Sequence, residues 1–131
     1  MRTQDAANTY RQEAVENAPP VKILRMLYAG ALRFIDRAAA SDPADPSSQF
    51  VHWVYKAEAI VTELRLTLDA EAAPEFVGQM QDLYLFVDAE LQTALKDRSV
   101  EPLSNARAVL ETLSDAWARV SVDEAPGTAQ S

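Results

Sequence analysis

Residues 20–38 read PVKILRMLYAGALRFIDRA, and this stretch decides the fold. Its apolar side chains recur three and four residues apart, which places them in one stripe along an α-helix. Four more apolar residues lie beside or off that stripe, namely Val21, Ile23, Met26 and Phe34. An ordinary surface helix needs only one apolar face. This helix is therefore predicted to be central in a bundle, or to keep part of its surface for a partner. The stripe itself comprises Leu24, Leu27, Tyr28, Ala31, Ile35 and Ala38.

A glycine, Gly30, stands in the middle of this predicted helix. Glycine at such a position costs roughly 1 kcal/mol relative to alanine. The favoured interpretation is that a neighbouring helix approaches closely there. The alternative is that a ligand segment lies against the bare backbone.

Three further stretches show the same helical period, at about residues 46–69, 74–96 and 99–120. Pro46 and Pro74 suit the first turns of two of them, and Asp45 or Ser47 and then Ser99 are candidate N-caps. Short links force neighbouring helices to run antiparallel. We predict an all-α, up-down-up-down four-helix bundle over residues 19–120. Residues 1–18 are predicted to form a flexible N-terminal segment and residues 121–131 a disordered tail.

The composition narrows the class of protein. The chain has 131 residues, no cysteine, 48% apolar residues and a formal net charge of −8. Disulfides and thiolate metal sites are excluded, and the acidic balance disfavours nucleic acid and anionic membranes as partners. No apolar run reaches the ~18 residues of a membrane span, and the first residues lack the apolar core of a secretory signal. A soluble, cytoplasmic protein is expected.

Enzymatic and cofactor chemistry find little support in the sequence. A di-iron bundle needs two inward-facing Glu-x-x-His pairs, whereas the single histidine, His52, is preceded three residues earlier by Gln49. One histidine supports no confident catalytic triad, and no glycine-rich phosphate loop is present. Met26 and Met80 are candidate haem ligands, but methionine at helical spacing is usually core filler. We expect no enzyme, no cofactor and no metal.

Surplus apolar residues also occur on the other three helices. Leu85 and Phe86 fall outside the apolar stripe of the third helix, and Val51, Leu66 and Val109 are surplus on the second and fourth. Such surface must be covered by a tail, a second copy or a partner. An amphipathic helix in a groove between bundle helices is one solution. A self-associating bundle that forms a homodimer and a cofactor-binding bundle stay open as alternatives.

Four blocks of sequence resemble the flagellar secretion chaperone family, FliS. The first runs from Tyr10-Arg11-Gln12 through Pro20 to MLYAGA at residues 26–31. The others are KAEAIVTELRLTLD at residues 56–69, LY at 83–84 and DAW at 115–117. The resemblance spans nearly all of the predicted ordered chain, and the order and spacing of the blocks make it specific.

The resemblance implies a chaperone that holds the C-terminal segment of flagellin in the cytoplasm, prevents premature polymerisation and assists delivery to the flagellar type III export apparatus. It also implies that the segment around Tyr10 can lie over the groove when flagellin is absent. The export gate and an anti-sigma factor are further candidate partners. Tyr10 and Leu27 are candidate contacts because their blocks match the family. The surplus-surface argument adds Ile23, Met26, Leu85 and Phe86 to the predicted flagellin-binding residues.

Overall fold

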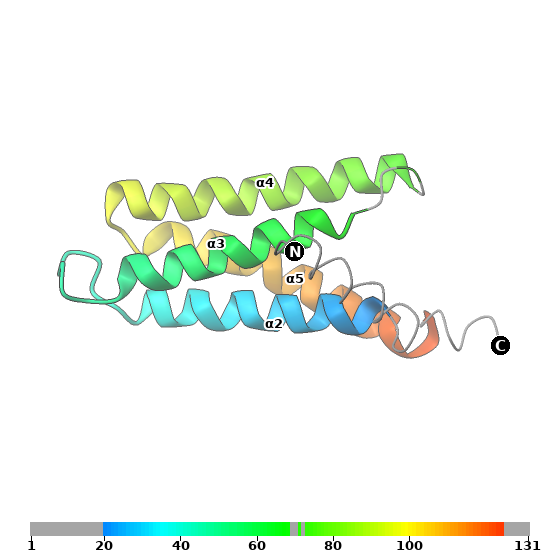
Figure 1. Ribbon diagram of the computed structural model, residues 1–131, viewed down its shortest axis with the longest axis horizontal. Helices are drawn as coiled ribbons and strands as arrows, with labels where there is room; N and C mark the ends of the chain where they lie inside the picture. The colour runs from blue at the N-terminus through cyan, green and yellow to red at the C-terminus, as the bar shows by residue number, and fades with distance from the viewer. Residues whose placement is uncertain (1–19, 69–70, 72, 125–131) are drawn as a thin grey trace, which may run out of the picture.

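The computed structural model describes residues 20–68, 71 and 73–124, and this part of the chain is entirely helical, without strands. The helices are α2 (Pro20–Ala39), α3 (Phe50–Leu66), α4 (Pro74–Asp97) and α5 (Glu101–Glu124). Each helix runs antiparallel to the next one along the chain (Figure 1). The predicted all-α four-helix bundle is confirmed. The N-terminal segment, with Tyr10, and residues 125–131 of the predicted tail lie outside the described residues.

The four helices pack in a cycle. Both α2 and α4 pack against α3 and α5, and the α3–α4 pair makes the least extensive contact of the four. Helices α2 and α4 are therefore diagonal to each other, with α3 between them on one side of the bundle (Figure 1). The start of α2, the end of α3, the start of α4 and the end of α5 gather at one end of the bundle.

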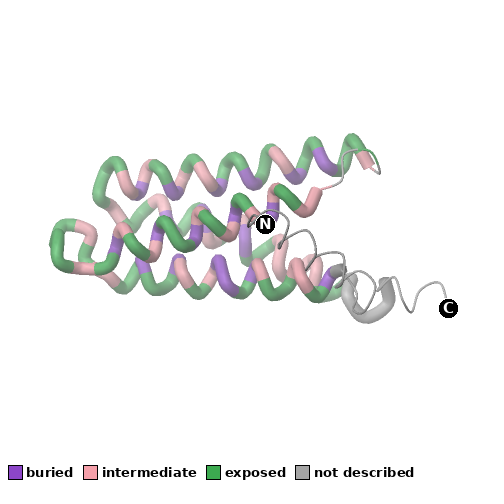
Figure 2. Tube along the Cα trace, viewed as in Figure 1, coloured by how far each residue is buried: buried purple, intermediate pink, exposed green. Residues whose placement is uncertain are grey.

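The core runs along the bundle between the inward faces of the helices (Figure 2). The stripe predicted for residues 20–38 faces it, since Tyr28, Ala31, Ile35 and Ala38 are buried and Leu24 and Leu27 pack against its margin. Burying one large aliphatic or aromatic side chain contributes roughly 1.5–3 kcal/mol. The largest fully buried side chains are Tyr28, Tyr84, Phe50, Ile35, Leu64, Leu91, Leu103 and Leu110.

Gly30 is buried on the side of α2 that packs against α3. A Cβ atom built on Gly30 would lie 2.9 Å from Cδ1 of Ile60 on α3. That separation is well below ordinary van der Waals contact. The glycine therefore makes room for a side chain of the neighbouring helix, while the close approach of the helix itself stays a prediction.

Two side chains that the sequence marked as surplus belong to the bundle. Val21 is buried. Phe34 stacks on Trp53 of α3, with ring centroids 5.6 Å apart, and the Arg37 guanidinium lies 4.9 Å from the Trp53 ring centroid. The wide apolar arc of α2 is therefore largely explained by packing on α3, because a helix that faces two neighbours and the core needs more than one stripe.

Helix α3 begins at Phe50, four residues later than predicted, and neither Asp45 nor Ser47 is its N-cap. The carboxylate of Asp45 instead accepts hydrogen bonds from the backbone N–H and the hydroxyl of Ser47, at 2.9 and 2.8 Å. Asp42 accepts from the N–H of Ala44 in the same way. Such turns compete with the helix for backbone donors, so the loop keeps its own structure up to the N-cap residue Gln49.

A short connection joins the end of α4 to the start of α5 and contacts the α2–α3 loop. Arg98, the C-cap of α4, adopts the left-handed conformation with φ 50°, and its side chain donates to the carbonyl of Pro43 at 3.3 Å. The Ser99 hydroxyl accepts from the N–H of Glu101, as expected of a cap. Helix α5 then continues to Glu124, so residues 121–124 are helical and the predicted disordered tail was placed too early. The sequence carries no helix breaker before Pro126, and a helix usually ends at or before the residue preceding a proline.

Candidate binding surface

Helix α4 carries the largest share of the exposed apolar surface. Phe76, Leu83, Leu85 and Phe86 keep 45%, 37%, 47% and 43% of their surface exposed. Single exposed apolar residues are normal on a protein, but four on one helix are surface that a partner can cover. They divide between two flanks of α4, with Leu85 toward α3 and Phe76 and Leu83 toward α5. The other exposed large apolar residues in the described part of the chain are Met26, Tyr55, Leu66 and Val100.

The predicted flagellin-binding residues fall in two groups. Met26 on α2 is 56% exposed, whereas Ile23 and Leu27 are half-buried and Leu27 packs against the core. Leu85 and Phe86 are exposed on α4. Tyr10 lies outside the described residues.

These two groups are not neighbours, because α3 lies between α2 and α4 (Figure 1). Leu85 lies on the side of α4 turned toward α3, since Gln81 and Gln92, which are four and seven residues away, bond Arg65 and Glu58 of α3. The outer surface of α3 presents Tyr55, 56% exposed, and Leu66, 50% exposed. A polypeptide that contacts both predicted groups must therefore cross α3 or α5, and a route past Leu85 crosses α3.

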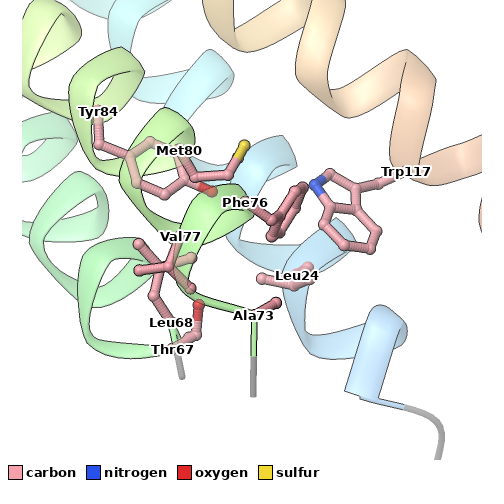
Figure 3. Close-up of a pocket in the computed structure, with 9 residues that line it drawn as sticks. All are labelled: Leu24, Thr67, Leu68, Ala73, Phe76, Val77, Met80, Tyr84 and Trp117. Carbon is pink, nitrogen blue, oxygen red and sulfur yellow. The ribbon is translucent and has the colours of Figure 1, made fainter. Parts of the chain in front are cut away.

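An apolar pocket opens at the end of the bundle where α2 and α4 begin and α3 and α5 finish (Figure 3). Its volume is about 210 Å³. Phe76 of α4 and Trp117 of α5 meet edge to face in its wall, with ring centroids 6.3 Å apart and planes at 81°. This aromatic pair can receive an apolar side chain, because the ring faces and edges offer large, rigid contact area. The pocket is lined by Leu24, Thr67, Leu68, Ala73, Phe76, Val77, Met80, Tyr84 and Trp117.

A group of three aromatic side chains lies against this pocket. The hydroxyl oxygens of Tyr28 and Tyr84 are 2.5 Å apart, and both side chains are fully buried. The indole N–H of Trp117 lies near the Tyr28 oxygen. Burial, followed by the bond to Tyr84, raises the pKa of the Tyr28 phenol far above its ordinary value, although the nearby Trp117 N–H acts to lower it. Burial also raises the pKa of Tyr84. Both phenols are therefore neutral hydrogen-bonding groups at physiological pH.

Sequence reasoning missed part of this surface. Phe76 and Leu83 recur at helical spacing with the buried Met80 and Tyr84 and were not among the predicted surplus residues, yet both are exposed. Leu83 faces α5, where that helix offers small residues such as Ala108 and Thr112. A stripe edge that faces small residues is the signal that could have marked Leu83.

No three metal-ligating side chains cluster anywhere in the described ranges. Within the same ranges, no helix is long and apolar enough to cross a membrane. The fold and this surface define a class: a helical bundle whose distinguishing features are apolar recesses on its exterior.

Comparison with known proteins identifies the family. The family described as "Flagellar protein FliS" matches residues 3–124. The flagellar secretion chaperone FliS of Campylobacter jejuni is 31% identical over 124 residues, covering 95% of this chain and 97% of the relative. That of Bacillus subtilis is 28% identical, covering 89% and 86%. The flagellar secretion chaperone FliSB of Pseudomonas aeruginosa is 25% identical, covering 92% and 99%. The chain belongs to the FliS family, so the resemblance predicted from its sequence blocks is confirmed.

Three of the blocks that carry the resemblance meet in space. MLYAGA contains Tyr28, the LY pair contains Tyr84, and DAW contains Trp117. These are the three side chains of the aromatic group beside the pocket. The blocks therefore describe one site at the end of the bundle rather than three separate features.

Proposed function

We propose that this protein is a cytoplasmic flagellar secretion chaperone that binds the C-terminal segment of flagellin. In this role it prevents premature polymerisation and assists delivery of flagellin to the flagellar type III export apparatus. Membership of the FliS family supports the role, as do the relatives of Campylobacter jejuni and Bacillus subtilis, which are flagellar secretion chaperones. The proposal assigns the protein no catalytic step.

The observation that carries the proposal is the apolar surface of α4. Leu85 and Phe86 are consecutive and nearly half exposed, although the adjacent Tyr84 and Val87 are fully buried. Covering one such side chain contributes up to roughly 1.5–3 kcal/mol. Ordering a free segment on binding costs several kcal/mol. A handful of apolar contacts therefore gives a complex that protects the cargo and still releases it.

The arrangement of the predicted contacts favours a cargo that wraps around the bundle. Neighbouring helix axes lie about 8–10 Å apart, so the path from α2 across α3 to α4 is on the order of 20 Å. An extended chain spans at most ~3.3–3.6 Å per residue, so at least about six residues must separate an anchor near Met26 from one near Phe86. Tyr55 and Leu66 lie on the intervening helix and offer contacts along that path.

Isothermal titration calorimetry with the flagellin C-terminal region tests the proposal. Phe86→Asp should weaken binding at least about tenfold, because it replaces a half-exposed ring by a charge that must be desolvated. Helicity by circular dichroism should be unchanged. Ala29→Asp, at an exposed position of α2 outside the predicted contacts, is the matched control and should bind normally.

Two results would count against this assignment. If Phe86→Asp unfolds the protein, Phe86 is part of the core in solution. If light scattering shows a constitutive dimer that ignores the flagellin region, the apolar surface serves self-association instead. Addition of the export gate or an anti-sigma factor to the flagellin complex tests the further partners that we propose.

A further inference from the structure

A second apolar recess lies between α4 and α5, away from α3. It has a volume of about 270 Å³ and is lined by Leu83 on α4 and by Ala108, Val109, Thr112 and Leu113 on α5. Leu83 is exposed, and Ala108 and Thr112 are small and exposed. The small side chains on α5 leave the shallow floor accessible to another helix.

Charged residues lie on α4 and α5 beyond the two ends of this groove, and they are unevenly distributed. Glu90 lies seven residues after Leu83 on the same face of α4, and its carboxylate accepts from the Asn105 amide of α5 at 2.9 Å. Asp97 lies seven residues after Glu90 on the same face of α4 and is exposed. Glu101 lies four residues before Asn105 on the same face of α5 and is also exposed. The end of the groove at the α4–α5 connection therefore carries three carboxylates.

The basic residues near that end are directed elsewhere. Arg98 donates to the carbonyl of Pro43 in the α2–α3 loop. Lys96 lies four residues after Gln92, which bonds Glu58 of α3, so it shares the face of α4 that is turned to α3. At the opposite end of the groove, Arg119 lies seven residues after Thr112 on the same face of α5 and is exposed. Asp115, four residues before Arg119, is exposed on the same face, so this end is mixed in charge, and the groove is acidic only at the α4–α5 connection.

We propose that the α4–α5 groove docks an amphipathic helix of a second partner protein, whose basic end lies over Glu90, Asp97 and Glu101. Charge complementarity selects this occupant, because carboxylates on one rim favour Lys or Arg and disfavour acidic segments. A helix that spans the groove has about 20 residues and a length of about 30 Å. A second copy of this chain is disfavoured by its net charge of −8. The groove lies on the flank of α4 opposite Leu85, but Phe86, three residues after Leu83 and four before Glu90, borders it, so an occupant of the groove meets the path proposed for flagellin at Phe86.

Fluorescence anisotropy with the full-length chain tests the proposal. The probe is a fluorescein-labelled synthetic helix of about 20 residues, with a Leu/Ala stripe and three Lys at one end. The comparison probe replaces the three Lys by Glu. We expect saturable binding of the Lys probe in the micromolar range, and binding of the Glu probe at least about tenfold weaker, since like charges oppose it.

Two variants locate the site. Ala108→Trp fills the groove and should reduce binding of the Lys probe at least about tenfold, whereas Ala59→Trp, the same change at an exposed position of α3, should not. The double change Asp97→Asn with Glu101→Gln should weaken binding about three- to tenfold and flatten its dependence on salt.

Competition relates this groove to the proposed flagellin site. Because Phe86 borders the groove, the flagellin C-terminal region should weaken binding of the Lys probe, and unchanged binding of the probe to the saturated chain would overturn this placement. Absence of saturable binding, equal binding of the two probes, or equal loss in the Ala108 and Ala59 variants would overturn it as well. The titration with the probe alone holds whether or not flagellin binds, so failure of the proposed function leaves that test intact.

Discussion

The hydroxyl pair of Tyr28 and Tyr84 allows a quantitative test of how the end of the bundle is held together. In Tyr84→Phe, the Tyr28 hydroxyl loses its bond to Tyr84 but keeps the Trp117 indole N–H nearby, which can take the place of the lost partner. The cost should be that of one neutral hydrogen bond, about 1 kcal/mol of the free energy of unfolding. The ring stays in place, so no cavity of side-chain size forms.

Tyr28→Phe should cost more, although it also removes a single oxygen atom. Removal of the Tyr28 hydroxyl leaves the Tyr84 hydroxyl without its partner, and the Trp117 N–H lies near Tyr28 rather than in place to replace it. Tyr84 is 1% exposed and water reaches it poorly. An unsatisfied buried polar group costs about 1–3 kcal/mol, so we expect about 2–3 kcal/mol for Tyr28→Phe. Removing both hydroxyls should cost less than the sum of the two single changes.

Urea unfolding followed by circular dichroism at pH 7 measures these differences. The chain should unfold in one transition, as single domains of this size usually do. Equal costs for the two single variants would show that the Trp117 N–H does not take the place of the partner that Tyr28 loses. Strict additivity in the double variant would show that the two hydroxyls do not interact in solution.

The same pair predicts a dependence on alkaline pH. Burial raises the folded-state pKa of both phenols. Stability from this source is therefore complete below the unfolded pKa of about 10 and is lost as pH rises above it. Tyr28→Phe should lose less stability than the wild type between about pH 9 and 11. Parallel loss in both proteins would contradict this.

Two further predictions concern helix contacts. Gly30→Ala should change stability little. The gain of about 1 kcal/mol in helix propensity is offset by the displacement of the Ile60 terminal methyl, which lies 2.9 Å from the new Cβ atom. In an Ile60→Val background, where that methyl is absent, the same change should stabilise the protein by about 1 kcal/mol. The pKa of Glu58 is raised, first because of burial and then because of its hydrogen bond with Asp88. Its contribution to stability is therefore present below the unfolded pKa and is lost as pH rises through the folded pKa. Glu58→Gln should gain stability relative to the wild type as pH increases from about 4 to 7.

Thermal and urea unfolding of the paired variants check both predictions. The same effect of Gly30→Ala in both backgrounds would show that Ile60 does not limit the contact. For Glu58→Gln, a stability difference that does not change with pH would show that the carboxylate pair does not share a proton. Asp45→Asn is a suitable control for pH, because Asp45 is an exposed loop carboxylate whose pKa is lowered by its bonds to Ser47 rather than raised.

The binding surface was only partly predictable. The exposure of Met26, Leu85 and Phe86 agrees with the surplus-surface argument, because each falls off the apolar stripe of its helix. The argument was wrong for Val21, which is buried, and it passed over Leu83. A helical wheel shows which residues share a face, but not how many neighbours that face meets. Whether these residues contact flagellin stays a prediction.

The amino-acid sequence by itself determined the number of helices, their antiparallel order and the family, because each depends on local periodicity, proline positions and short blocks along the chain. The tertiary structure decided which neighbours meet. It brought Tyr28, Tyr84 and Trp117 together, turned Phe34 onto Trp53, and opened the recess beside Ala108. These contacts join residues far apart in the chain, and they depend on how four helices rotate and pack at once, which no single stretch of sequence encodes.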